Sequence, residues 1–258
     1  MKLYLRYLSI HVRSQMQYRT SFLLTVLGQF CTSFTAFLGV YFMMTRFHEV
    51  KGFSFSEVLL CFAVVLMAFS LAECFVRGFD MFASMIGNGE FDRIMVRPRN
   101  EIFQVLASKI ELSKVGRLAQ AILIFCYALP RSGVAWSADR IAVLALMVVS
   151  GIAVFSGLFV VYAGLCFFTT DGLEFMNIFT DGGREFGVYP FSIYGESVLR
   201  FFTFVVPLAL FQYYPLLYLT GREGGAAYAL CPLLAFLFLL PCYGLWKLGM
   251  RHYKSTGS

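Results

Sequence analysis

Charged side chains are scarce in this sequence. Aspartate, glutamate, lysine and arginine make up 14% of the 258 residues, whereas soluble proteins carry about 25%. With 59% hydrophobic residues, the chain lacks the polar surface of an ordinary water-soluble domain. The long uncharged runs are typical of segments that cross a lipid bilayer. We therefore predict a single all-α transmembrane domain over residues 1–258, with no soluble domain of useful size.

Motifs for catalysis and metal binding are also missing. No Gly-x-x-x-x-Gly-Lys-Ser/Thr motif is present to hold nucleotide phosphates, and neither His-Glu-x-x-His nor Gly-x-Ser-x-Gly occurs. The three histidines, His11, His48 and His252, lie in separate polar segments. The seven cysteines form no Cys-x-x-Cys pair, so we expect buried thiols rather than disulfides or ligands. We predict that the chain is not an enzyme and holds no metal or cofactor of its own.

Six apolar segments are long enough to cross the ~30 Å hydrocarbon core of a bilayer. Pro207 and the Tyr213-Tyr214-Pro215 triplet interrupt the fifth segment, which predicts a kink and an irregular outer end. The fourth has more uncharged residues than a perpendicular crossing needs, so tilt, a bend or a protruding end must absorb the excess. The predicted spans are residues 22–45, 57–76, 115–136, 141–168, 199–219 and 227–246.

Residues 1–20 differ from these spans because polar and apolar side chains alternate at helical spacing. The pattern predicts an amphipathic helix in the membrane interface, with its basic side toward the lipid headgroups. A frayed extension of the first span is the alternative. The polar stripe comprises Lys2, Arg6, Ser9, Arg13 and Gln17, and the neighbouring apolar face comprises Leu5, Leu8, Val12 and Met16.

The distribution of basic residues predicts the orientation of the chain. Six spans place both termini on one side, and 16 of the 21 lysine and arginine residues fall in the segments on that side. The remaining 5 fall in the opposite links. Because basic residues accumulate in cytoplasmic loops, we predict that both termini are cytoplasmic.

Residues 77–114 form the longest polar region, on the predicted cytoplasmic side. A Gly87-Asn88-Gly89 turn signal precedes the charged block 89–98, in which four of ten residues are ionisable. Asn100 is a suitable N-cap for a following helix. Because no proline intervenes before Pro130, we expect one helix to run from Asn100 directly into the third span.

Glu73 is the one charged residue in the interior of the second predicted span, which begins at Glu57, and Arg77 follows four residues later. This order and spacing suit a helical ion pair at the membrane boundary. A carboxylate within a membrane is also a candidate proton carrier. A structural pair with Arg77 is the interpretation that the position near the end of the span favours.

The span centres give no sign of an internal energy source. Secondary transporters usually carry charges near the bilayer midplane or broken helices in matching halves. All six predicted span centres are uncharged, and residues 1–130 and 131–258 show no repeat of one another. If the chain moves a cargo, the energy must come from another protein, and the charged block 89–98 is the natural docking point.

Two stretches carry a resemblance to a known family. The first is Gly89-Glu90-Phe91-Asp92 through Arg97-Pro98, followed by Phe103-Gln104-Val105-Leu106. The second runs through Tyr189-Pro190-Phe191-Ser192-Ile193-Tyr194, Pro207 and Tyr213-Tyr214-Pro215. Both resemble segments of permeases of the type 2 ABC-exporter class, in the bacterial branch encoded with a partner permease and an ATPase.

This resemblance implies a coupling helix between the second and third spans that fits a groove on a separate ABC ATPase. ATP and Mg²⁺ would bind to that ATPase, and a second permease, identical or different, would complete the cargo path in a bacterial cytoplasmic membrane. Contact with lipid headgroups or solvent is the alternative role for each coupling residue. The residues assigned to ATPase coupling are Glu90, Phe91, Asp92, Arg93, Arg97 and Pro98.

Aromatic residues and a proline in the fifth segment fit two roles, namely lining an apolar cargo path between two permeases or packing between helices. Lipid, peptide antibiotic and hydrophobic drug all suit such a path. A membrane anchor or assembly protein is the second hypothesis for the chain, and an ion-coupled transporter is the third. The residues assigned to the cargo path are Phe204, Pro207, Phe211, Tyr213 and Tyr214.

Overall fold

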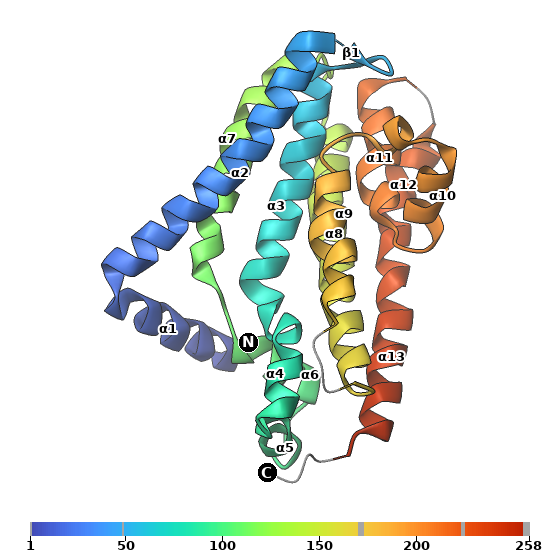
Figure 1. The fold of residues 1–258 in the computed structure, drawn as a ribbon. Helices are drawn as coiled ribbons and strands as arrows, with labels where there is room; N and C mark the ends of the chain where they lie inside the picture. The colour runs from blue at the N-terminus through green and yellow to red at the C-terminus, as the bar shows by residue number, and fades with distance from the viewer. Residues whose placement is uncertain (1, 48, 170–172, 223–224, 255–258) are drawn as a thin grey trace.

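Residues 2–47, 49–169, 173–222 and 225–254 are described by a computed structural model, which is a bundle of long helices (Figure 1). The α-helices are α1 (Lys2–Gln17), α2 (Arg19–Phe47), α3 (Phe55–Asp80), α4 (Phe82–Gly87), α5 (Glu90–Met95), α6 (Glu101–Ser108), α7 (Val115–Ala128), α8 (Ala138–Cys166), α9 (Asn177–Phe186), α10 (Glu196–Phe204), α11 (Leu208–Thr220), α12 (Ala226–Ala235) and α13 (Leu239–His252). The 3₁₀ turns are η1 (Leu112–Lys114), η2 (Leu129–Arg131), η3 (Glu174–Met176), η4 (Phe191–Tyr194) and η5 (Phe236–Phe238).

Among the described residues, five helical segments are long and apolar enough to cross a membrane. The bent pair α10–α11 would make a sixth. The prediction of an all-α polytopic membrane protein is therefore confirmed. The five segments are Arg19–Phe47, Phe55–Gly87, Leu112–Arg131, Ala138–Cys166 and Ala226–His252.

The two ends of the bundle are built differently. Both termini lie at the end that carries α1, α4, α5 and α6 (Figure 1), which we call the terminal end. The opposite end carries a short antiparallel hairpin of β1 (Glu49–Val50) and β2 (Phe53–Ser54), and we call it the hairpin end. These names describe the fold and leave the sidedness of the membrane aside.

Helix α3 lies at the centre of the bundle, where it contacts α7, α8 and α11. Apart from charged residues near its ends it is apolar, as expected of a helix surrounded by others, and 19 of its 26 residues are buried. Gly151 of α8 permits a close approach to α3, because a Cβ at that position would lie 2.7 Å from the Cβ of Ala68. Phe69 of α3 then packs edge-on against Phe155 of α8 at 5.0 Å between ring centroids.

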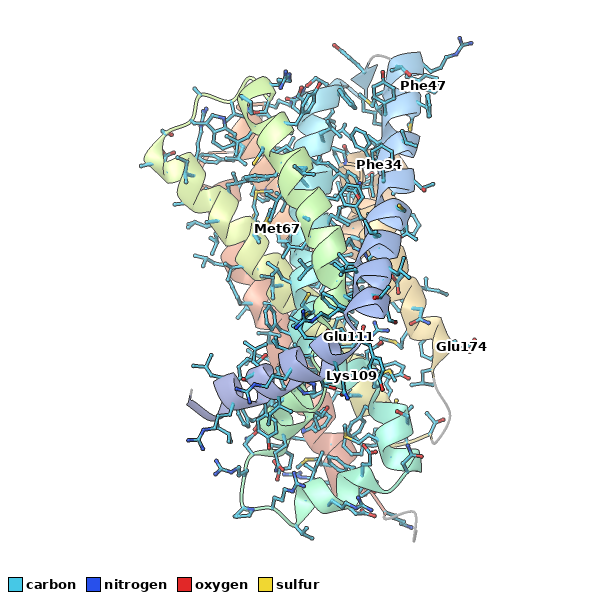
Figure 2. All side chains as sticks on the ribbon, turned by 90° about the vertical axis from the view of Figure 1, so that its left-hand side faces the viewer. Phe34, Phe47, Met67, Lys109, Glu111 and Glu174 are labelled. Atoms are coloured by element: carbon cyan, nitrogen blue, oxygen red, sulfur yellow. The ribbon has the colours of Figure 1, made fainter. Side chains whose placement is uncertain are left out.

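Helix α2 is far less covered, with only Ser33, Val40 and Met44 buried. It leans away from the bundle toward the terminal end, and α1 runs across that end as a separate helix at an angle to it (Figures 1 and 2). Two side chains of α1 reach the chain near α6: His11 bonds the carbonyl of Ala107, and Gln15 donates to the carbonyl of Ile110. The interfacial placement of α1 stays a prediction.

The single helix that we expected to run from Asn100 into the third span is not formed. Helix α6 ends at Ser108, and α7 begins only at Val115 after a non-helical stretch and the η1 turn. The amide of Glu111 donates to the carbonyl of Cys74 at 3.1 Å, so this stretch bonds to α3 instead of to its own preceding turn. Tertiary contact here overrides a local preference for helix.

The predicted fifth span, 199–219, is not straight either. Helices α10 and α11 meet at a bend of 113°, and the non-helical residues between them include Pro207, which supplies no backbone N–H. The kink at Pro207 was predicted, but its size makes this segment a broken or re-entrant element.

The polar cluster 181–185, which the sequence led us to expect as a solvated loop or a short surface helix, lies in the short helix α9, where Asp181 and Glu185 are exposed and only Thr180 and Gly183 are buried. A Cβ on Gly187, just past α9, would lie 3.0 Å from Val65 in the middle of α3. Further on, the carbonyl of Ser192 accepts a hydrogen bond from Lys51 in the β-hairpin turn at 2.6 Å. From Gly187 to Ser192 the chain therefore runs along α3 toward the hairpin end. Arg184 faces Phe69 of α3 rather than bulk water.

Candidate functional site

The terminal end is shaped by three short helices that follow α3. Gly89 joins α4 to α5 with a φ of 66°, a left-handed conformation that glycine adopts without steric strain. The side chain of Asn100 caps α6 by accepting from the amide of Phe103, as predicted. Gln104 of α6 then donates to the carbonyls of Ile94 and Arg99. Helix α5 is thus fixed at both ends and lies at the extremity of the molecule (Figure 1).

Phe91 anchors α5 to the helices above it. Its side chain is fully buried and packs edge-on against Phe82, Phe167 and Tyr253, with ring centroids 5.0, 5.4 and 5.2 Å apart. Trp246 of α13 closes the cluster at 6.2 Å. A residue enclosed in this way has no free surface for a second protein. The assignment of Phe91 as a direct coupling contact therefore changes to that of an anchor.

Asp92 is held from the opposite end of the chain. The hydroxyl of Tyr253 donates to Asp92 Oδ1 at 2.9 Å. Burial, followed by the hydrogen bond and charge of Asp92, raises the pKa of Tyr253 to about 12, so the phenol remains a donor at neutral pH. This bond joins α5 directly to the end of α13.

The remaining charges of the block face outward. Glu90, Arg93 and Arg97 are exposed and line a cavity of about 240 Å³. Pro98 is also exposed, and the apolar side chain of Val96 is 83% exposed. An exposed surface with both charge signs and an apolar centre is suited to docking another protein.

A second polar feature lies where α3 meets the chain between α6 and α7. Glu73 is only 3% exposed and binds three cations. Arg77 lies 3.2 Å from Glu73 Oε1, and Lys114 lies 3.1 Å from the same oxygen. Arg117 pairs with Oε2 and also donates to Gln29 of α2 at 2.7 Å. The helical pair that we predicted is therefore one edge of a four-residue cluster.

The cluster is extended on its more exposed side. Arg77 also pairs with Asp80 at 2.9 Å and with Glu111 at 3.7 Å, and Lys109 pairs with Glu111 at 3.3 Å. Figure 2 shows Lys109 and Glu111 beside α1. Ion pairs thus join α3 to residues 109–117, and the hydrogen bond from Arg117 to Gln29 adds α2 to the same level. A carboxylate that is shared among three cations is suited to fixing helices in place and poorly suited to carrying protons.

Sequence patterns alone gave neither Arg117 nor Lys114 a partner. A basic residue at the start of an apolar helix was the available signal, because a buried cation requires a counter-charge. Only the fold shows that Glu73, 44 residues earlier, supplies it.

The five residues assigned to the cargo path do not share one surface. Phe211 is fully buried and packs against Phe155, and Pro207 is buried. Tyr214 bonds with Thr203 across the α10–α11 bend at 3.2 Å and packs with Tyr213. Phe204, in contrast, is 83% exposed. Packing between helices therefore accounts for most of this set, and Phe204 alone is open to a ligand or partner.

The family model of ABC-2 family transporter proteins matches residues 30–257. The chain belongs to the ABC-2 transporter family. No curated protein and no solved structure matches it. The match begins within α2 and covers every later helix, including α4, α5 and α6.

As an ABC-2 permease, the chain is a multi-pass membrane component of an ABC transporter. Membership implies association with an ABC ATPase, because permeases of this kind work with a separate ATP-hydrolysing subunit. The exposed α5 surface and the Glu73 cluster are then the two features whose roles within the permease have to be assigned.

Proposed function

We propose that this permease is the membrane subunit of an ATP-driven exporter and forms the cargo path with a second permease. ATP and Mg²⁺ bind to a separate ATPase, which docks on α5. The observation that carries the proposal is the geometry of α5, whose charged side chains Glu90 and Arg93 are exposed, as is Arg97 just after it, while Phe91 fixes the same helix to the bundle. A helix that is both accessible to the ATPase and rigidly anchored to the bundle can transmit a movement of the ATPase to the other helices.

The route of transmission follows from the contacts of α5. Phe91 and Asp92 bind α13 through Trp246 and Tyr253, and Gln104 binds the end of α5 to α6. Movement of the ATPase is thereby passed to α13 directly. The Glu73 cluster keeps residues 109–117 fixed to α3, so α7 follows the same movement.

We place the terminal end in the cytoplasm of a bacterial cell. Arg184 and Arg200 lie on α9 and α10 rather than in a cytoplasmic loop, and without them the terminal end still holds 14 basic residues against 5 at the hairpin end. The positive-inside rule favours the same orientation as before. A docking site for an ATPase must also face the compartment that contains ATP.

The test is to co-purify the permease with its ATPase in mild detergent and to measure ATP hydrolysis by the complex. Reversing two exposed charges, Arg93→Glu together with Arg97→Glu, should release the ATPase. Arg131→Glu, at an exposed position of the hairpin end, is the matched control and should leave the complex intact. Retention of the ATPase by the double variant would overturn docking on α5, and a chain that never co-purifies with an ATPase would favour a membrane anchor.

A further inference from the structure

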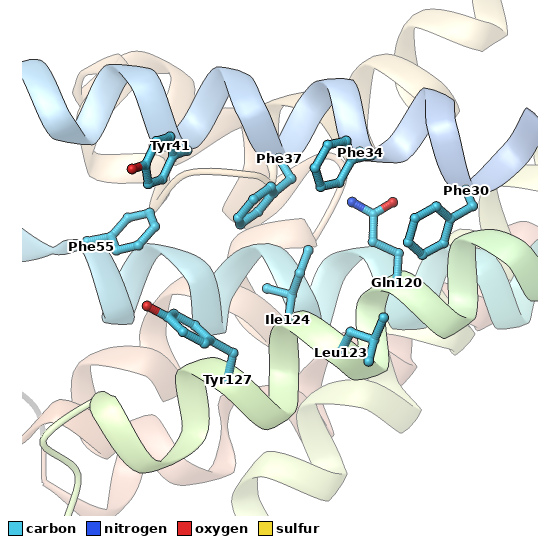
Figure 3. A pocket seen from close by; sticks show the side chains of 9 residues that line it. All are labelled: Phe30, Phe34, Phe37, Tyr41, Phe55, Gln120, Leu123, Ile124 and Tyr127. Carbon is cyan, nitrogen blue, oxygen red and sulfur yellow. The ribbon is translucent and has the colours of Figure 1, made fainter.

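An aromatic groove runs between α2 and α7 on the side of the bundle that α2 leaves open (Figure 3). Its volume is about 350 Å³. None of the residues that line it is charged. They are Phe30, Phe34, Phe37, Tyr41, Phe55, Gln120, Leu123, Ile124 and Tyr127.

One wall of the groove is a ladder of rings along α2. Phe30, Phe34, Phe37 and Tyr41 stack in sequence with centroids 6.4, 5.7 and 6.4 Å apart. The eleven helical steps from Phe30 to Tyr41 span about 16 Å, roughly half of the ~30 Å hydrocarbon core. The groove therefore matches the depth of a single acyl chain in one leaflet.

Gln120 adds a polar group to the otherwise largely apolar lining of the groove. Its side-chain amide lies among the rings at one end of the groove (Figure 3), and the residue is 2% exposed. Neither its nitrogen nor its oxygen has a hydrogen-bond partner. A buried amide without partners is unfavourable by about 1–3 kcal/mol, so its presence here needs a reason beyond packing. The neighbouring rings of α2 are exposed or half-buried and can turn to admit a partner for it.

We propose that this groove binds a single-chain amphiphile whose neutral polar group hydrogen-bonds with Gln120. A side-chain amide offers donors and an acceptor together, so its best partner is a group that does the same, such as an amide or a hydroxyl. The chain of the ligand lies along the α2 ladder toward Tyr41 and Phe55. The absence of charged residues from the lining selects against fatty acids and cationic amphiphiles.

Binding is measured by native mass spectrometry of the purified chain in an amine-oxide detergent, which offers neither amide nor hydroxyl groups. Three probes of equal chain length are titrated: hexadecanamide, methyl hexadecanoate and hexadecane. The amide should bind roughly tenfold more tightly than the ester or the hydrocarbon. In Gln120→Leu that preference should vanish while the hydrocarbon still binds. Equal binding of the three probes by the unsubstituted chain, or an intact preference in Gln120→Leu, would overturn the proposal.

A second pair of variants keeps the test decisive if Gln120→Leu folds poorly. Leu123 lines the groove, whereas its neighbour Ile122 does not, and both are exposed on α7. Leu123→Ala should weaken all three probes, and Ile122→Ala should leave them unchanged. If both variants bind the probes as the unsubstituted chain does, the site is excluded. It is also excluded if no probe binds saturably, as would happen if a second permease occupied the groove.

The amphiphile has two possible sources, which ATP hydrolysis by the complex distinguishes. A cargo should stimulate hydrolysis in a manner that Gln120→Leu abolishes, whereas a resident bilayer lipid should bind without stimulation. Both outcomes support the site. The binding test uses the permease alone, so its failure is separate from any failure of ATPase docking on α5.

Discussion

The hydroxyl of Tyr253 donates to Asp92 Oδ1 at 2.9 Å, which joins two residues 161 positions apart in the sequence. Tyr253 directly follows α13, the last helix of the bundle, and Asp92 lies on the exposed helix α5. The C-terminal part of the chain is thus hydrogen-bonded to α5, the helix that we propose as the docking site of the ATPase. A pair of this kind cannot be inferred from spacing along the chain.

Replacing Tyr253 with phenylalanine removes this bond while keeping the ring that packs on Phe91 and Phe167. We expect the free energy of unfolding to fall by about 1 kcal/mol and substrate-stimulated ATP hydrolysis by the complex to fall with it. Because the pKa of Tyr253 is raised in the folded state, the stabilisation is complete below the ordinary tyrosine pKa of about 10 and is lost as the pH rises through about 12. A stability difference between the two proteins that grows above pH 10 would contradict this assignment.

Phe91→Ala should destabilise the terminal end strongly. Removing a fully buried phenylalanine leaves a cavity, and such substitutions destabilise by about 3–5 kcal/mol. We expect faster hydrogen exchange in residues 90–95, with the membrane-spanning helices still protected. Met95→Ala, on the exposed side of the same helix, should leave exchange unchanged, and similar exchange in the two variants would remove the anchor role.

Glu73→Gln tests the buried charge cluster. The substitution leaves Arg77, Lys114 and Arg117 around a neutral side chain, and loss of one partner from a buried pair is unfavourable by about 3–5 kcal/mol. The control is Glu196→Gln, which breaks an exposed pair with Arg200 at the same helical spacing and should change stability by at most about 1 kcal/mol. Thermal unfolding in detergent measures both. If Glu73→Gln is as stable as the control, the cluster does not hold the helices together.

Gln212→Leu tests how the non-helical backbone after α9 is tolerated inside the bundle. Gln212 is fully buried on α11 and donates to the carbonyls of Gly187 and Tyr189 at 3.0 and 2.9 Å. Unpaired backbone groups within a membrane are unfavourable, so we expect a loss of about 2 kcal/mol in unfolding free energy. Gln17→Leu, at an exposed position of α1, is the control for the change of residue type. Equal melting temperatures for the two variants would show that these carbonyls find other donors.

Several expectations could be read from residue patterns because local physics decides them. The uncharged runs required helices in a membrane, and Asn100 had the side chain that caps the helix after it. Pro207 lacks the N–H that a continuous helix needs, so a break there was expected. The charged block 89–98 was recognised as an exposed feature because charge is rare elsewhere in the chain.

The failures share a different cause. The helix expected to run from Asn100 into the third span is interrupted, because the amide of Glu111 donates to the carbonyl of Cys74 on α3. The solvated surface helix expected around residues 181–185 holds for Asp181 and Glu185, which stay exposed, whereas Arg184 pairs with both carboxylates and also lies over Phe69 of α3 at 4.9 Å. Local composition could not reveal either contact, because Cys74 and Phe69 belong to a helix that is remote in the sequence.

The sequence alone determined that this protein is helical, that it spans a membrane several times and that one charged segment stands apart, since each follows from side-chain chemistry within a single stretch. The tertiary structure decided which side chains of different helices contact one another. It buried Phe91 beside four other aromatic residues, surrounded Glu73 with three cations and left Gln120 without a partner in an aromatic groove. Such roles depend on distances between helices that are remote in sequence, and packing sets those distances.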